Sequence, residues 1–144
     1  MYKHLTRYLS GLIMSLIIVS PAARSDFICL ANVHDGLHSN IEDVSLIVSG
    51  EQTSWANGST IRLALPGKSS PQLDRISTRF MSATAKELQR HWLRLAFSGR
   101  AAPPKFFNST EDLIAFLRKT PGSVGFIEAS QEIDSSGLTQ IEIM

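Results

Sequence analysis

Two polar runs have the residue types that bind an anion, and each stands where a helix is expected to begin. Residues 39–40 (Ser-Asn) precede a periodic apolar segment, and residues 68–70 (Lys-Ser-Ser) precede Pro71. Ser and Asn are favoured N-cap residues, and proline is favoured at the first position of a helix. Free backbone N–H groups and the helix dipole attract an anion to such an end. The candidate ligand-binding residues are therefore Ser39, Asn40, Lys68, Ser69 and Ser70.

An ordinary capping role is the alternative for both runs, and the sequence leaves it open. Ser39 and Ser70 would serve as N-caps whether or not an anion binds. Pro71 has no N–H group to donate, and Lys68 is the only cation of its run. Arg75, one turn further on, either reaches the anion or belongs to a solvated helix face.

The sequence offers little for metal binding or catalysis. His34 and His38 are four residues apart, but Gly36 lies between them, so they are expected in a loop and not on one helix face. Cys29 is the only cysteine and is expected to be buried in a strand. The chain has no Gly-x-Ser-x-Gly turn and no Walker phosphate loop. We therefore expect no catalytic residue, no metal, no cofactor and no enzymatic activity.

The clearest predicted helix covers residues 85–97. Thr84 and Glu87 have the spacing of a capping box, with Ser82 as an alternative N-cap. Apolar residues recur along one side of this helix at positions Leu88, Trp92, Leu95 and Ala96. Because Trp92 is large, this side must meet a substantial partner surface supplied by other segments.

Strands and helices alternate along the rest of the chain. Apolar runs and alternating patterns predict strands at residues 27–33, 59–65, 123–129 and 138–144. Helices are predicted at residues 41–49, 71–81, 85–97 and 110–120, and no strand is predicted at residues 105–107. Strands joined by helical crossovers predict an α/β domain with a mixed, mostly parallel sheet flanked by helices.

Residues 1–25 have the features of a secretory signal peptide. Lys3 and Arg7 precede an apolar run at residues 8–19, and small residues follow at 20–23. A retained membrane anchor is the alternative, but this run of 12 residues is shorter than the roughly 20 that a membrane-spanning helix needs. The sequence thus predicts a cleaved signal and an exported domain at residues 26–144.

The charge of this domain argues against a nucleic-acid partner. Three of the 14 Lys and Arg residues lie in residues 1–25, which leaves 11 against 13 Asp and Glu in residues 26–144. A nucleic-acid-binding domain typically has a clear excess of basic residues.

An ordered series of motifs runs through the chain from residue 49 onward. It comprises residues 49–50 (Ser-Gly), 55–59 (Trp-Ala-Asn-Gly-Ser), Phe80, Trp92 with 97–99 (Phe-Ser-Gly), 103–104 (Pro-Pro) and 121–126 (Pro-Gly-Ser-Val-Gly-Phe). This series resembles the phosphate-binding proteins of ABC transporters, most closely their short, single-domain exported members. The similarity spans roughly residues 27–129.

The resemblance implies a fold like that of type II periplasmic binding proteins. It also implies a periplasmic solute-binding protein that holds phosphate or a related oxyanion for an ABC permease or a sensor. Residues 68–70 fall where this family has its phosphate-binding loop. Full-length members close two lobes on the ligand, whereas residues 26–144 make about one lobe. Tight capture would therefore need a second chain, for example in a homodimer; the alternative is an envelope interaction protein that has kept the lobe as a scaffold.

Overall fold

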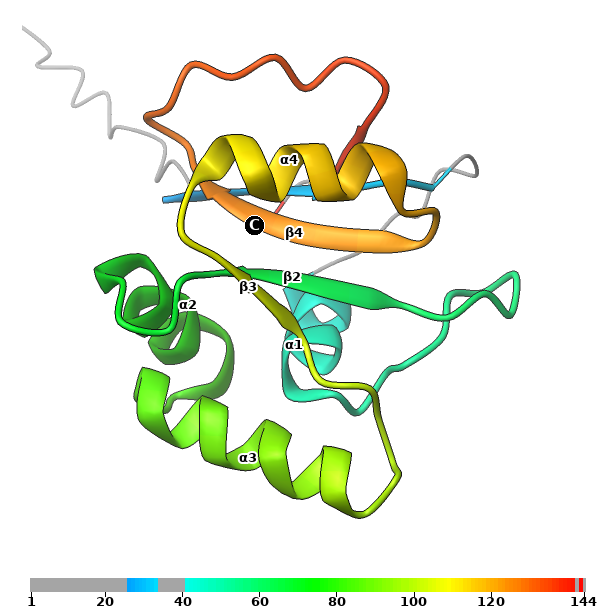
Figure 1. Cartoon of the computed structure of the whole chain (residues 1–144), viewed down its shortest axis with the longest axis vertical. Helices are drawn as coiled ribbons and strands as arrows, with labels where there is room; N and C mark the ends of the chain where they lie inside the picture. The colour runs from blue at the N-terminus through cyan, green and yellow to red at the C-terminus, as the bar shows by residue number, and fades with distance from the viewer. Residues whose placement is uncertain (1–25, 34–40, 142, 144) are drawn as a thin grey trace, which may run out of the picture.

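The computed structural model describes residues 26–33, 41–141 and 143. These residues form one five-stranded sheet, in the order β3-β2-β4-β1-β5, with helices on both faces (Figure 1). The elements in chain order are β1 (Phe27–Ala31), α1 (Ile41–Ser49), β2 (Arg62–Pro66), α2 (Pro71–Met81), α3 (Ala85–Phe97), β3 (Lys105–Phe107), α4 (Thr110–Lys119), β4 (Ser123–Glu128) and β5 (Thr139–Ile141).

The sheet is mixed, with most strands running in one direction. β2 pairs in parallel with both β3 and β4. β1 runs antiparallel to β4 and to β5, so among the described strands it alone points the other way. This confirms the α/β fold with a mixed, mostly parallel sheet that the sequence predicts.

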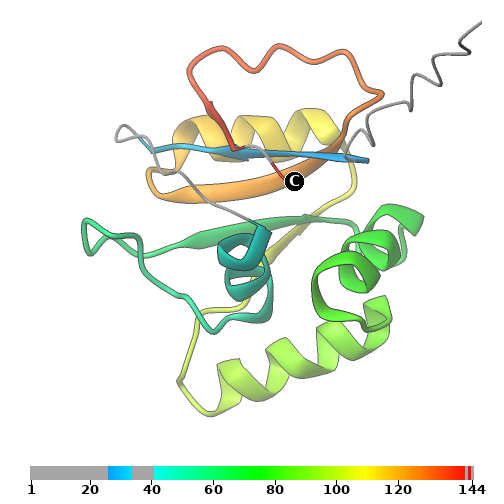
Figure 2. The same cartoon turned by 180° about the vertical axis from the view of Figure 1, so that it is seen from behind.

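Helices form unequal layers on the two faces of the sheet. α4 covers one face, while α1 and α2 cover the other (Figures 1 and 2). α3 lies beyond α1 and α2 as an outer layer, at the end of the molecule opposite α4.

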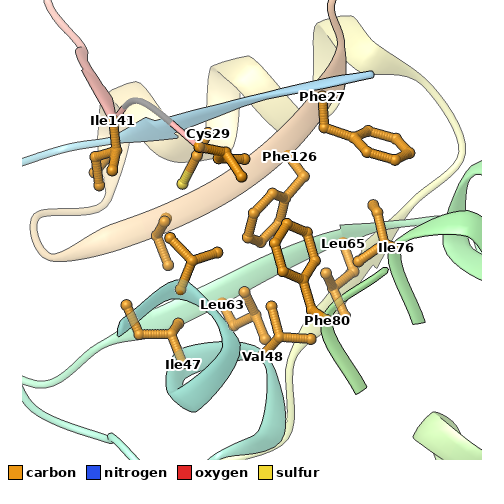
Figure 3. Close-up of a cluster of buried hydrophobic side chains, with 14 of the residues drawn as sticks. Phe27, Cys29, Ile47, Val48, Leu63, Leu65, Ile76, Phe80, Phe126 and Ile141 are labelled. Atoms are coloured by element: carbon orange, nitrogen blue, oxygen red, sulfur yellow. The ribbon is translucent and has the colours of Figure 1, made fainter. Parts of the chain in front are cut away.

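The larger hydrophobic core lies between the sheet and the layer of α1 and α2 (Figure 3). Its labelled members are Phe27, Cys29, Ile47, Val48, Leu63, Leu65, Ile76, Phe80, Phe126 and Ile141. Cys29 is fully buried, as predicted, and burial raises the pKa of its thiol well above the usual range. A smaller core under α4 contains Leu30, Ala64, Leu113, Leu117 and Ile127. Both cores begin at or after Phe27, so a polypeptide of residues 26–144 keeps the whole described core.

The sequence patterns did not predict one of the strands, β3. Residues 105–107, where no strand was predicted, form β3 and pair in parallel with β2. Three residues that follow a proline pair are too few to show an alternating pattern, and the edge position leaves both phenylalanines only half-buried. The predicted strand at 59–65 is also shifted, because β2 begins at Arg62 and residues 54 and 60 form an isolated bridge before it.

The α3 helix begins at the predicted N-cap. The Thr84 hydroxyl accepts a hydrogen bond from the Glu87 backbone, and the Glu87 carboxylate accepts one from the Thr84 backbone. These hydrogen bonds lower the pKa of Glu87. The alternative N-cap, Ser82, is wrong, since this residue has left-handed backbone geometry and ends α2 instead.

Trp92 joins α3 to the layer beneath it. Its side chain is buried, and its indole Nε1 donates a hydrogen bond to the Val48 carbonyl at 3.0 Å. The neighbouring His91 ring lies 2.7 Å from the Ser49 carbonyl oxygen, at the same end of α1. The sequence predicted that Trp92 needs a partner surface, and the C-terminal end of α1 provides it.

Replacing Trp92 with alanine should lower the free energy of unfolding by about 3–5 kcal/mol, because the change removes a large buried ring and leaves its space empty. Urea unfolding of the 26–144 polypeptide measures this. Leu93→Ala is the matched control, since Leu93 is 55% exposed on the same helix. Equal midpoints for the two variants would contradict the role given to Trp92.

Candidate ligand-binding site

A cavity of about 520 Å³ lies at the edge of the sheet formed by the carboxyl ends of β2, β3 and β4. Parallel strands bring their carboxyl ends to one edge, where ligands of open α/β sheets bind. The polar residues that line the cavity include Lys68, Ser69, Ser70, Gln72, Asn108, Ser109, Thr110, Glu128 and Gln131. Phe106 and Phe107 contribute to its apolar wall.

The start of α2 forms one side of this cavity. Ser70 is the N-cap, and its hydroxyl oxygen accepts a hydrogen bond from the Leu73 N–H. The Ser70 N–H donates to the Gly67 carbonyl at 2.9 Å, which closes a turn. In the described part of the chain, the N–H groups of Ser69 and Gln72 donate to no other atom. Those two groups, with the Ser69 hydroxyl, are the donors available to a ligand.

Lys68 supplies a positive charge beside these donors. Its Nζ atom lies 5.2 Å from the centroid of the Phe106 ring on the cavity wall. Among the described residues it forms no ion pair. The Lys68 carbonyl accepts a hydrogen bond from the Gln89 side chain at 3.0 Å, which ties this loop to α3.

The start of α4 forms the other side of the cavity. Ser109 is the N-cap of α4 and accepts a hydrogen bond from the Asp112 N–H at 3.1 Å. Asn108 packs directly on Gly67, so the two helix starts are in contact. The sequence predicted that Ser109 caps α4. It did not predict that the starts of α2 and α4 lie side by side, because this depends on β3 lying beside β2.

A carboxylate at the end of β4 also lines the cavity. Glu128 forms an ion pair with Arg75, whose guanidinium carbon lies 5.5 Å from the centroid of the Phe27 ring. Arg75 therefore contacts a cavity wall instead of belonging only to a solvated helix face. The charges of Arg75 and Glu128 offset each other. Lys68 therefore supplies the charge on the cavity lining that has no ion-pair partner among the described residues.

Three of the predicted site residues, Lys68, Ser69 and Ser70, line this one cavity. Ser39 and Asn40 lie outside the described residues, as do His34, His38 and the predicted signal peptide. Within the described ranges, no group of three or more His, Cys, Asp or Glu residues could hold a metal ion. None of the helices described is long and apolar enough to cross a membrane.

Most of the motif residues that carry the family resemblance lie outside this cavity, and several of them support the fold; Phe126 is the one that lines it. Trp55 donates a hydrogen bond from Nε1 to the Gly122 carbonyl at 2.8 Å, at the opposite edge of the sheet. Gly122 has φ +77°, and a Cβ there would lie 2.7 Å from the Thr60 carbonyl oxygen. Gly50 likewise leaves room for Trp92, because a Cβ at Gly50 would lie 2.8 Å from its ring.

The fold is that of one lobe of a periplasmic-binding-protein-like domain. A family model described as the PBP superfamily domain matches residues 16–143, and the chain belongs to this family. Among curated protein sequences, no relative matches it.

Several solved structures with the same fold are described as phosphate transport or phosphate binding proteins. One is an ABC-type phosphate transport receptor from Vibrio cholerae, with a TM-score of 0.54 and 17% identity over 82% of this chain and 46% of that one. Another is a possible phosphate binding protein from Planctomyces limnophilus, with a TM-score of 0.60 and 9% identity over 83% of this chain and 41% of that one.

A third is a putative phosphate ABC transporter substrate-binding protein with bound phosphate from Clostridium perfringens, with a TM-score of 0.56 and 10% identity. The match covers 82% of this chain and 44% of that chain. The chain thus spans less than half the length of these proteins. The resemblance predicted from the motifs is confirmed at the level of the family and the fold.

Replacing Gly122 with alanine should destabilise the protein by about 1–3 kcal/mol more than Gly58→Ala does, because the new methyl group meets backbone. Gly58 is the matched control, since it has φ +84° and a Cβ added there would meet no atom within 4 Å. Both variants carry the same left-handed strain. Thermal unfolding of both variants tests the difference, and equal stabilities would show that the approach of Gly122 to Thr60 is not needed.

Proposed function

We propose that this chain is an exported solute-binding protein that binds phosphate or a related oxyanion at the start of α2. The observation that carries the proposal is the cavity shared by two helix N-termini, where Lys68 forms no ion pair among the described residues and the Ser69 and Gln72 N–H groups are available. Helix N-termini favour anions through their free N–H groups and dipole. The names of the solved neighbours support phosphate as the first ligand to test.

The available groups suit a small oxyanion. Phosphate and sulfate present several acceptor oxygens, and charge-assisted hydrogen bonds to such oxygens are the stronger class. Lys68 and Ser69 supply donors from the α2 side, and Ser109 and Thr110 lie on the α4 side. The Arg75 partner of Glu128 offsets the one carboxylate on the wall, which reduces its repulsion of an anion.

The proposal includes a second surface over the ligand, because the chain spans less than half of its structural neighbours. An ABC permease, an envelope sensor or a second copy of this chain would supply it. In this account residues 1–25 are removed on export, the domain of residues 26–144 acts in the periplasm, and it catalyses no reaction.

The second candidate is a non-binding envelope interaction protein that keeps the lobe as a scaffold. The use of Ser70 favours this alternative. Its N–H donates to Gly67, its hydroxyl caps Leu73, and the following Pro71 has no N–H to offer. A loop whose polar groups serve its own turn could cap α2 and do nothing more.

Isothermal titration of the 26–144 polypeptide with phosphate, and then with sulfate, separates the two candidates. We expect saturable heat with micromolar affinity, and we expect the Ser69→Ala/Ser70→Ala double variant to lose it. The lost cap should cost about 1 kcal/mol of stability. Thr84→Ala is the matched control, because it removes an N-cap of the same kind from α3 and Thr84 does not line this cavity.

Two results would count against the proposal. No heat with either anion from folded wild-type protein would favour the scaffold. Equal affinity for wild type and the double variant would place the site elsewhere on the chain.

A further inference from the structure

The outward side of α3 carries two large apolar residues that the fold does not use. Leu93 is 55% exposed and Phe97 is 90% exposed. They are four residues apart, so they adjoin on one side of the helix. The opposite side, with Leu88 and Trp92, is buried against the rest of the molecule. Both cartoon views place α3 at one end of the molecule, opposite α4 (Figures 1 and 2).

Basic residues surround this apolar pair. At about 100° per residue, Lys86, Arg90 and Arg94 project from the same half of the helix as Leu93 and Phe97. All three side chains are exposed. Arg100, which is also exposed, follows just after the helix. We call these six residues, Lys86, Arg90, Leu93, Arg94, Phe97 and Arg100, the α3 outer face.

The positive charges of the α3 outer face have few partners. Among the described residues, no ion pair involves Lys86, Arg94 or Arg100. Glu87 is the one acid on α3, and its carboxylate is held in the capping box with Thr84. The cations are concentrated here although residues 26–144 carry 11 Lys and Arg against 13 Asp and Glu.

We propose that the α3 outer face docks on an anionic phospholipid surface. Phe97 and Leu93 would enter the boundary between headgroups and acyl chains, as the apolar side of an interfacial helix does. The arginines would pair with lipid phosphates, for which their planar, forked donors are suited. The net negative charge of the remaining surface would be repelled by the same membrane, so the charge distribution also fixes the orientation.

A bilayer fits this face better than an acidic protein does. Leu93 and Phe97 protrude from the outer side of α3 among the cations, and such an arrangement suits a flat, deformable surface. The cavity at the start of α2 takes no part in the docking, so this proposal and the anion-binding proposal can fail separately.

The test is sedimentation of the 26–144 polypeptide, which contains the whole described core, with phosphatidylcholine vesicles made with and without phosphatidylglycerol. We expect binding only to the vesicles with phosphatidylglycerol, and weaker binding as salt is raised. Arg90→Gln/Arg94→Gln/Arg100→Gln and Leu93→Ser/Phe97→Ser should each reduce the vesicle affinity about tenfold or more.

The matched control removes three exposed cations from other surfaces, in Arg62→Gln/Lys105→Gln/Lys119→Gln, and should bind as wild type does. Circular dichroism confirms that each variant is folded. The proposal is overturned if folded wild type ignores the anionic vesicles, in which case an acidic protein becomes the partner to seek. It is also overturned if the α3 variants bind as tightly as the control.

Discussion

The parallel pairing of β2 with β3 on one side and with β4 on the other determines where the crossover helices and the cavity lie. Parallel strands need crossover connections, and here those connections are α2 with α3 on one face and α4 on the other. Each helix that follows a strand then starts at the same edge of the sheet. The starts of α2 and α4 meet around one cavity for this reason, and Glu128 at the end of β4 completes its wall.

Most residues that identify the family lie apart from the residues that could bind a ligand, and Phe126 is the motif residue that also lines the cavity. Trp92 fastens α3 to α1, and Trp55 fastens its turn to Gly122 at the edge opposite the cavity. These contacts involve rings and close backbone approaches, which tolerate little substitution. A chain can therefore keep the motifs of a binding protein for reasons of folding alone. The question of ligand binding rests on Lys68, Ser69 and their neighbours.

Most helices could be predicted because their ends carry strong local signals. The predicted N-caps are confirmed for three helices: Ser70 for α2, Thr84 for α3 and Ser109 for α4. Pro71 and Glu87 strengthened the first two of these signals. The strand β3 could not be predicted, since its pairing with β2 depends on tertiary contacts between residues far apart in the chain. Half of the cavity was missed with it, because residues 108–110 join the site only through that pairing. The hydrogen bond from the Ser70 N–H to the Gly67 carbonyl was likewise not visible from residue types.

The most direct test of this account is a titration of isotope-labelled 26–144 polypeptide with phosphate, followed in the nitrogen–proton correlation spectrum. If two helix starts form one anion site, the amide signals of Ser69 and Gln72 and those of residues 108–110 should move together with a single affinity. The Gly122 signal, at the opposite edge of the sheet, should stay in place. Signal shifts only at the opposite edge of the sheet, or no shift at either helix start, would contradict the account.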